Sequence, residues 1–417
     1  MKKLTYILTI LHVVKILHAH TWKCSLLSDK DYDIPKGSFC SDFCWMSGKN
    51  PYKPECKKET FPIVDFIFHE HNLTNNVYVE RSCWVETSPE MSQTSINCIN
   101  VVANLMKDMR NKNHEPKLIY IVHGFRYKMG WLRGLKDGLF KRYSRENTIV
   151  AKVLWIKGAS KRSMTANVQS NRRSDTWLDK LEKSTVCCEP VSHAYFGYGT
   201  SAANTWLIGI VLSKLHSLII IGQGEHKTNA NCIGYSLGAH VCGFFGKSLQ
   251  TMSNKRHFLN KIVGLDPAGP IFEYKEHDRD LRLNQCDAER VEILYTNRLR
   301  LGFGGGPLGH LEFYINGGYT QPWCGSICSH AYVTYLLIDI LYNGMPCYFE
   351  QNNDVDRGSD TCTASKLKPI CIKDNPVAYL GDLDENLKLV MGKYEVKTEA
   401  VQRVRLVTTR CKYSTFK

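Results

Sequence analysis

The chain has 417 residues, of which 43% are hydrophobic and 23% are charged. These proportions are near the globular average and exclude a disordered, collagen-like or coiled-coil protein. Lys and Arg outnumber Asp and Glu by 54 to 40, which gives a formal net charge of +14. After the first twenty positions no run of 18 apolar residues occurs, so we expect no transmembrane helix.

The N-terminus has the pattern of a secretory signal. Lys2 and Lys3 precede a mostly apolar run over residues 4–17, and the small residue Ala19 follows it. A charged start, an apolar centre and a small residue are the three parts of a cleavable signal. We therefore expect residues 1–19 to be removed and the protein to be secreted; the alternative is an N-terminal anchor or a buried helix.

Seventeen cysteines, spread from Cys24 to Cys411, also favour export. None has the paired two-residue spacing of a zinc ribbon, so disulfides in an oxidising compartment fit better. Because the count is odd, at least one thiol is free or pairs with another chain. Asn72 begins the sequon Asn-Leu-Thr, which predicts N-glycosylation in an exported chain.

Strands and helices are predicted to alternate along most of the chain. Residues 20–60 are rich in Cys, Pro and Lys and are expected to form loops, as are the polar stretches 84–97 and 160–193. Buried strands are predicted over 61–68, 117–122, 149–155 and 261–265, and helices over 98–110, 201–221, 240–249 and 331–342. This alternation predicts a mostly parallel, doubly wound α/β sheet with helices on both faces.

Residues 234–238 read Gly-Tyr-Ser-Leu-Gly, a G-x-S-x-G sequence between a short strand and a helix. In that setting the serine sits on a sharp turn with its hydroxyl exposed. The alternative is a glycine-rich turn with a capping serine. We take Ser236 as the candidate nucleophile, because the residues that such a serine needs follow in the required order.

A serine hydroxyl is a poor nucleophile unless a histidine takes its proton and a carboxylate orients that histidine. In this fold the chain order is Ser, then Asp or Glu, then His. Asp266 stands at the end of the strand predicted over 261–265, and His330 directly precedes the helix predicted over 331–342. These positions predict a Ser236–His330–Asp266 triad.

Backbone N–H groups must stabilise the alkoxide that forms during acyl transfer. One donor is the residue after the nucleophile, here Leu237, and the other lies in the loop after an early strand. His123-Gly124-Phe125 ends the strand predicted over 117–122. We therefore expect Phe125 and Leu237 to form the oxyanion hole, and we expect no metal or other cofactor.

Several long segments resemble the pancreatic-type animal lipase family: VHGF (122–125), GYSLGAHVCGFFGK (234–247), IVGLDPAGPIFE (262–273), DAERVEILYT (287–296), GHLEFYINGGYTQPWC (309–324), CSH (328–330) and GKYEVKT (392–398). The resemblance implies a disulfide-bonded α/β-hydrolase fold and carboxylic-ester hydrolysis by the same triad and oxyanion residues. It also implies a catalytic domain over 61–400, with 160–193 as an insertion and 401–417 as a tail.

The chain departs from the family pattern around the site. Leu154 stands where the family usually has Asp, and Tyr295 where it usually has His. The insertion 160–193 contains the adjacent pair Cys187-Cys188, for which two separate bridges are favoured over a vicinal disulfide. Some family members carry structural calcium, but no full ligand set maps onto this sequence.

The loops over the site indicate the substrate. Triacylglycerol lipases of the family carry a lid of about twenty residues between two cysteines, which Cys324 and Cys328 match with only three residues between them. The loop over 296–310 is also short and glycine-rich. Both features resemble secreted phospholipase A1 members and imply cleavage of the first-position acyl ester of glycerophospholipids.

Two other functions stay open on the sequence: a neutral-lipid lipase or broad carboxylesterase, and a non-catalytic lipid-binding protein of the same fold. We expect a phospholipid or lipid aggregate surface as partner, since a basic protein is attracted to anionic lipid. No basic-aromatic module predicts nucleic-acid binding. No colipase-type partner is expected, because no C-terminal β-sandwich is expected after the catalytic domain. The sequence gives no oligomeric state.

Overall fold

The computed structural model describes residues 60–72, 74–87, 91–126, 130–159, 197–273, 281–298, 300–305, 307–322, 324–343, 383 and 392–396. The expected signal, nearly all of the Cys-rich segment 20–60, the insertion 160–193 and the tail 401–417 lie outside these residues. The predicted domain boundaries therefore stay predictions.

A nine-stranded sheet runs through the described part of the chain in the order β2-β1-β4-β3-β5-β6-β7-β8-β9. The antiparallel strand β1 pairs with both β2 and β4, and every other neighbouring pair is parallel. The strands are β1 (Ile63–Asn72), β2 (Val77–Glu86), β3 (Lys117–Val122), β4 (Thr148–Leu154), β5 (Asn229–Tyr235), β6 (Lys261–Leu265), β7 (Arg290–Tyr295), β8 (Leu311–Ile315) and β9 (Gly392–Val396).

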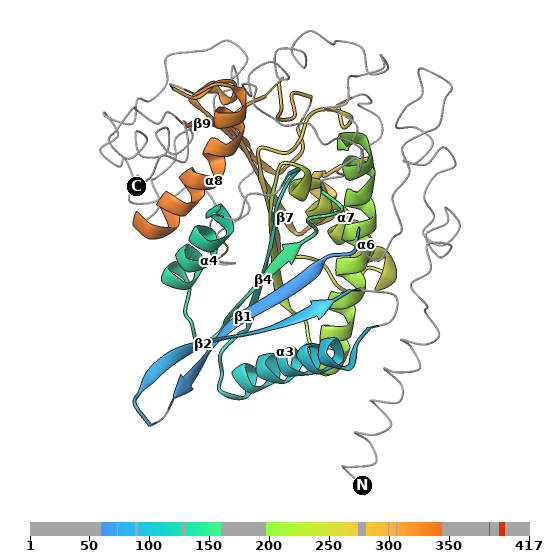
Figure 1. Ribbon diagram of the computed structural model, residues 1–417, viewed down its shortest axis with the longest axis vertical. Coiled ribbons are helices and arrows are strands. Elements are labelled where there is room, and N and C mark those ends of the chain that lie inside the picture. Colours follow the sequence, from blue (N-terminus) through green and yellow to red (C-terminus); the bar gives the residue numbers. More distant parts are fainter. Residues whose placement is uncertain are drawn as a thin grey trace, which may run out of the picture.

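Helices cover both faces of this sheet, as the sequence predicts (Figure 1). One face carries α3 (Gln93–Asn111), α6 (Tyr198–Gly222) and α7 (Leu237–Met252), and the other carries α4 (Gly130–Arg142) and α8 (Ser326–Asn343). In β3, Tyr120 and Val122 belong to the core on the α7 side, and Ile119 and Ile121 belong to the core on the α8 side. Successive strand residues face opposite ways, so a strand covered on both faces is apolar throughout.

Helix α6 is long and apolar enough to cross a membrane by length and composition, but 78% of its most apolar window is buried in the fold. It is the only described helix with that property. A core helix of a globular domain passes the same test, because neighbours on all sides require it to be apolar all round.

Two sequence expectations differ from the structure before β3: the extent of the loop over 84–97 and the start of the helix that follows it. The loop expected over 84–97 is shorter at both ends, because β2 extends to Glu86 and α3 begins at Gln93. Strand β2 lies at the sheet edge and is mostly exposed, so it lacks the apolar run that marks a buried strand. Helix α3 starts early because the Ser92 side chain accepts a hydrogen bond from the Ser95 N–H and caps it. Helix α4 was not predicted.

Helices α6 and α7 approach each other closely at Gly209. A Cβ atom at this position would lie 2.5 Å from the Cβ of Phe244 and 2.7 Å from the backbone nitrogen of Phe245. The second of these neighbours is backbone, which cannot rotate away. Any larger residue at 209 would therefore push α6 away from α7, the helix that follows Ser236.

We expect Gly209→Ala to lower the free energy of unfolding by about 1–3 kcal/mol, the usual cost of overpacking a core. Gly130→Ala is the matched control, because a Cβ at Gly130 would meet nothing within 4 Å. That variant should be neutral or slightly more stable, since Ala favours helix over Gly. Urea unfolding of both variants measures the difference. Equal stabilities would contradict the close approach of the two helices.

Candidate active site

The G-x-S-x-G sequence forms a tight turn between β5 and α7. Ser236 has φ 56° and ψ −121°, a backbone conformation that residues with a side chain rarely adopt. A Cβ on Gly234 would lie 2.3 Å from the carbonyl oxygen of Gly238, and one on Gly238 would lie 2.3 Å from that of Val122. The two glycines therefore allow the strand, the serine turn and the helix to meet at this distance.

Ser236, His330 and Asp266 are brought together by the fold, although 94 residues separate the first two in the chain. His330 Nε2 lies 2.8 Å from Ser236 Oγ, and His330 Nδ1 lies 2.6 Å from Asp266 Oδ2. Asp266 is fully buried, whereas 6–7% of Ser236 and His330 stays accessible. This is the hydrogen-bond order that a serine nucleophile, its base and an orienting carboxylate require.

The second oxygen of Asp266 is held by backbone N–H groups from the end of β7. Its Oδ1 accepts hydrogen bonds from the Thr296 N–H at 2.8 Å and the Asn297 N–H at 3.1 Å. These two bonds fix the orientation of the carboxylate, so that its other oxygen, Oδ2, faces His330. Thr296 and Asn297 contribute only backbone groups here, so no side-chain motif could have revealed this role.

The loop after β3 lies against the serine turn and is held by His123. The Trp155 N–H donates to His123 Nε2 at 3.1 Å, so the other nitrogen, Nδ1, carries the proton and donates to the Gly124 carbonyl at 2.9 Å. Burial lowers the pKa of His123 to about 4, which keeps the ring neutral as this arrangement requires.

Phe125 and Leu237 are the residues expected to form the oxyanion hole. Phe125 lies in the loop after β3, and Leu237 directly follows Ser236. Leu237 is the first residue of α7, and Phe125 follows the His123-Gly124 turn. The Phe125 ring packs edge-on against Tyr198, whose hydroxyl donates to the Pro270 carbonyl at 3.1 Å. The loop that carries Phe125 is thus linked to the loop that follows Asp266.

Cys324 and Cys328, the cysteines expected to flank a short lid, form a disulfide. Three residues lie between them, and α8 begins at the second of these, Ser326. The remaining described cysteines form two more disulfides, Cys83–Cys98 and Cys232–Cys242, except for Cys286, which is free and exposed. Cys187 and Cys188 lie outside the described residues.

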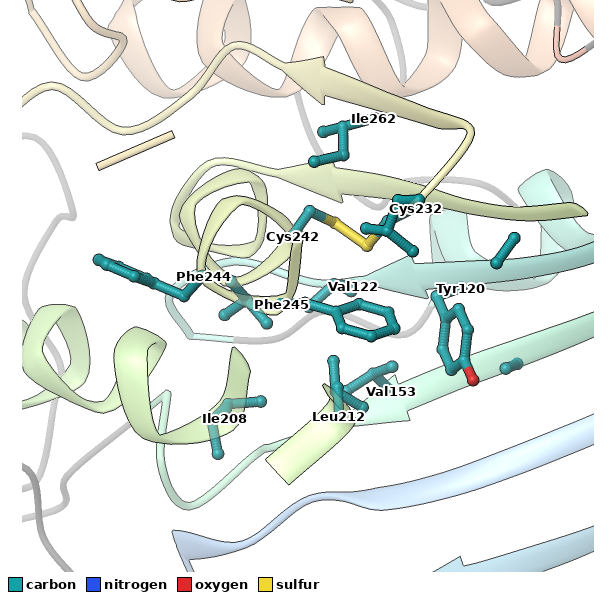
Figure 2. Packing of buried hydrophobic residues seen from close by; sticks show 14 of the residues in the cluster. Tyr120, Val122, Val153, Ile208, Leu212, Cys232, Cys242, Phe244, Phe245 and Ile262 are labelled. Atoms are coloured by element: carbon teal, nitrogen blue, oxygen red, sulfur yellow. A yellow bond between two sulfur atoms is a disulfide. The ribbon is translucent and has the colours of Figure 1, made fainter. Parts of the chain in front are cut away.

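The disulfide Cys232–Cys242 spans the serine turn itself. Cys232 lies in β5, Cys242 lies in α7, and Figure 2 shows the bond between them beside Val122 and Phe245. Both cysteines are fully buried. The sequence did not reveal this bridge, because connectivity cannot be deduced from cysteine positions alone.

The expected glycosylation of Asn72 and the expected absence of a metal or other cofactor stay predictions. Asn72 is exposed at the end of β1, and its side-chain oxygen accepts a hydrogen bond from the Thr74 N–H at 2.9 Å. This geometry does not test whether Asn72 carries a glycan. Within the described ranges, no three His, Cys, Asp or Glu side chains are grouped as a metal site. The expectation of no cofactor is likewise untested.

The parallel sheet, the helices on both faces and the strained serine turn after β5 define an α/β-hydrolase fold. A protein-family model described as "Lipase" matches residues 88–341. The chain therefore belongs to the lipase family, and the resemblance to pancreatic-type lipases is confirmed.

The curated relatives that the chain matches include phospholipases A1 and a putative endothelial lipase. A "Phospholipase A1" of Vespula squamosa is 37% identical over 145 residues, which cover 33% of this chain and 47% of that protein. A "Phospholipase A1" of Polybia paulista is 32% identical, covering 44% and 57% of the two chains. A "Putative endothelial lipase" of Crotalus adamanteus is 29% identical, covering 62% and 48%. The chain spans about half the length of the curated relatives it matches.

Solved structures offer only a distant likeness. A structure described as a predicted CIB-like hydrolase from Thermoplasma acidophilum is 13% identical, with a TM-score of 0.24, and covers 54% of this chain and 86% of that one. At this level of similarity it adds nothing to what the sheet order and the serine turn already establish.

We expect the disulfide across the serine turn to matter for activity as well as for stability. Cys232→Ala/Cys242→Ala should lose about 3 kcal/mol, the loop-entropy value for a closed loop of this length. It should also lower kcat, because the bridge fixes strand and helix on either side of Ser236. The control is Cys83→Ala/Cys98→Ala, which removes a bridge between β2 and α3.

That control should lose a similar amount of stability and keep its kcat at temperatures where it stays folded. Thermal unfolding and ester hydrolysis are measured on both double variants. A Cys232/Cys242 variant with unchanged kcat would show that the turn holds its shape without the bridge.

Proposed function

We propose that this chain is a secreted serine hydrolase of lipid carboxylic esters that acts through an acyl-enzyme. One observation carries the proposal: the continuous hydrogen-bond chain from Asp266 Oδ2 through His330 to Ser236 Oγ, on a serine turn at the carboxyl end of β5. Membership of the lipase family supports the same chemistry. A non-catalytic lipid-binding protein has no need for this buried chain.

In the proposed reaction Ser236 Oγ attacks the ester carbonyl carbon while His330 Nε2 takes the hydroxyl proton. The carbonyl oxygen becomes an alkoxide, which the N–H groups of Phe125 and Leu237 stabilise. His330 then gives its proton to the departing alcohol oxygen, and the acyl group stays on Ser236. Water, deprotonated by the same His330, releases the fatty acid and restores the serine.

For the substrate we propose glycerophospholipids, cleaved at the first-position ester. The three-residue loop between Cys324 and Cys328 is too short for a helical lid, and phospholipase A1 relatives from several wasps support this substrate class. A triacylglycerol lipase or broad carboxylesterase is the second candidate, favoured by the similarity to the putative endothelial lipase.

Export and lipid-surface binding belong to the same proposal. Three disulfides among the described residues fit an oxidising compartment. Without residues 1–19, which include Lys2, Lys3 and Lys15, the formal net charge falls from +14 to +11 and would still draw the protein toward anionic lipid. Each Lys or Arg near such a surface contributes roughly 1 kcal/mol. No nucleic-acid or colipase-type partner is proposed.

Ser236→Ala should lower kcat by at least about a thousandfold and leave the fold intact, because only the nucleophilic oxygen is removed. His330→Ala should be as severe, and the double variant should be no worse than either single one, since the two residues act as a unit. Ser144→Ala, at an exposed serine, is the control and should keep full activity. Hydrolysis of a short-chain ester and labelling by a fluorophosphonate give the readouts.

The labelling separates the enzyme from a lipid-binding protein. A fluorophosphonate should modify Ser236 and no other serine, and should fail on Ser236→Ala. Retained hydrolysis in Ser236→Ala, or a double variant whose loss equals the product of the two single losses, would remove the assignment.

A further inference from the structure

Arg300 lies at the rim of the candidate active site, on the short loop between β7 and β8. Its guanidinium donates a hydrogen bond to Ser326 Oγ at 3.1 Å, and its side chain is exposed. Ser326 is the first residue of α8, and His330 follows four positions later. Residues four apart lie on the same face of a helix, with Cβ atoms about 5–6 Å apart. Arg300 is thus hydrogen-bonded to the first turn of α8, one helical turn before His330.

A second contact fixes this loop against the carboxylate of the triad. A Cβ on Gly302 would lie 2.6 Å from Asp266 Oδ1, so the backbone two residues after Arg300 packs directly on Asp266. The Gly269 N–H also donates to the Leu301 carbonyl at 2.8 Å. The loop therefore has a defined place beside the His330–Asp266 pair, and Arg300 is carried on it.

The chemistry of the proposed reaction sets which part of the substrate faces Arg300. His330 must protonate the departing alcohol oxygen, so the leaving group lies on the His330 side of the site. For the first-position ester of a glycerophospholipid, the leaving group is the lysophospholipid. Its departing oxygen is on the first glycerol carbon, and its phosphate is on the third. Arg300, which contacts the helix turn before His330, is therefore on the leaving-group side of the site, and the leaving group carries the phosphate.

Two other arginines near the site are placed differently. The guanidinium of Arg298 lies over the Tyr314 ring at 4.8 Å and donates to the Gly304 carbonyl at 3.3 Å. Arg126 directly follows Phe125 and lies over its ring at 5.2 Å, on the side of the expected oxyanion hole. Arg300 instead donates to Ser326, one helical turn before His330.

We propose that Arg300, with the Ser326 hydroxyl, binds the phosphodiester of a glycerophospholipid and thereby favours phospholipid over neutral glyceride. The inference rests on the proposed ester hydrolysis and names the residue that sets its substrate class. Guanidinium and hydroxyl donors suit phosphate oxygens, and charge-assisted hydrogen bonds of this kind are the strong ones. A neutral diacylglycerol offers no phosphate to this pair and gains nothing from it.

The test compares two esters with the same acyl chains, dihexanoyl phosphatidylcholine and dihexanoylglycerol, both as monomers in water. Arg300→Gln should lower kcat/KM for the phospholipid about 10- to 100-fold, as loss of a charged hydrogen bond implies. It should change kcat/KM for the glyceride less than about twofold, because that ester makes no charged bond there. Arg300→Lys should recover part of the phospholipid rate.

The control for overall charge is Arg81→Gln, which removes one exposed arginine from β2, near the opposite end of the sheet from Ser236. It should leave both esters unchanged. Equal losses on the two esters in Arg300→Gln would mean that Arg300 only supports the fold of the site. No loss on the phospholipid would mean that it does not bind the phosphate. Either result overturns the proposal.

A binding measurement keeps this inference separate from the proposed hydrolysis. Calorimetric titration of Ser236→Ala with dihexanoyl phosphatidylcholine gives a Kd without turnover, and adding Arg300→Gln should raise it about 10- to 100-fold. If the wild type hydrolyses neither ester but this Kd still rises, hydrolysis is refuted and the phosphate site stands. If inorganic phosphate alone binds as tightly as the phospholipid, the site belongs to a free anion and the headgroup proposal fails.

Discussion

The strained backbone of Ser236 is the constraint on which the rest of the site depends. A residue with a side chain at φ 56° costs roughly 1–3 kcal/mol, and it persists only where its surroundings fix it. Here β5 is buried before it, α7 is packed behind it, and the Cys232–Cys242 bridge joins the two. The strain turns the hydroxyl out of the sheet and toward His330, where it can meet an ester.

Parallel strand order brings the other groups to the same place. Ser236 follows β5, Asp266 follows β6 and the Thr296 N–H follows β7, and these three strands are neighbours in the sheet. Because parallel strands end at one edge, residues far apart in the chain converge there without any further device. Helix α8 then places His330 over the gap between nucleophile and carboxylate, and its first residue, Ser326, reaches the loop that carries Arg300.

Much of this arrangement could be predicted from the sequence, because it depends on strand ends and on glycines. Buried strands such as β3 and β6 are mostly apolar, and each is followed at once by residues of the site. The exposed edge strand β2 has no such signal, which explains why its last residues, 84–86, were expected to be part of a loop. The Cys232–Cys242 bridge and the Arg300–Ser326 contact depend on tertiary distances, and no pattern in the chain encodes them. Backbone donors such as the Asn297 N–H leave no side-chain trace at all.

The central claim is that Ser236 cleaves the first-position ester of a glycerophospholipid. The most direct measurement is early-time product analysis, by mass spectrometry, of a phosphatidylcholine with palmitoyl at the first position and oleoyl at the second, run beside triolein. We predict that palmitate and the oleoyl lysolipid appear first, and that triolein is hydrolysed more slowly. Release of oleate first, or faster hydrolysis of triolein than of the phospholipid, would contradict it.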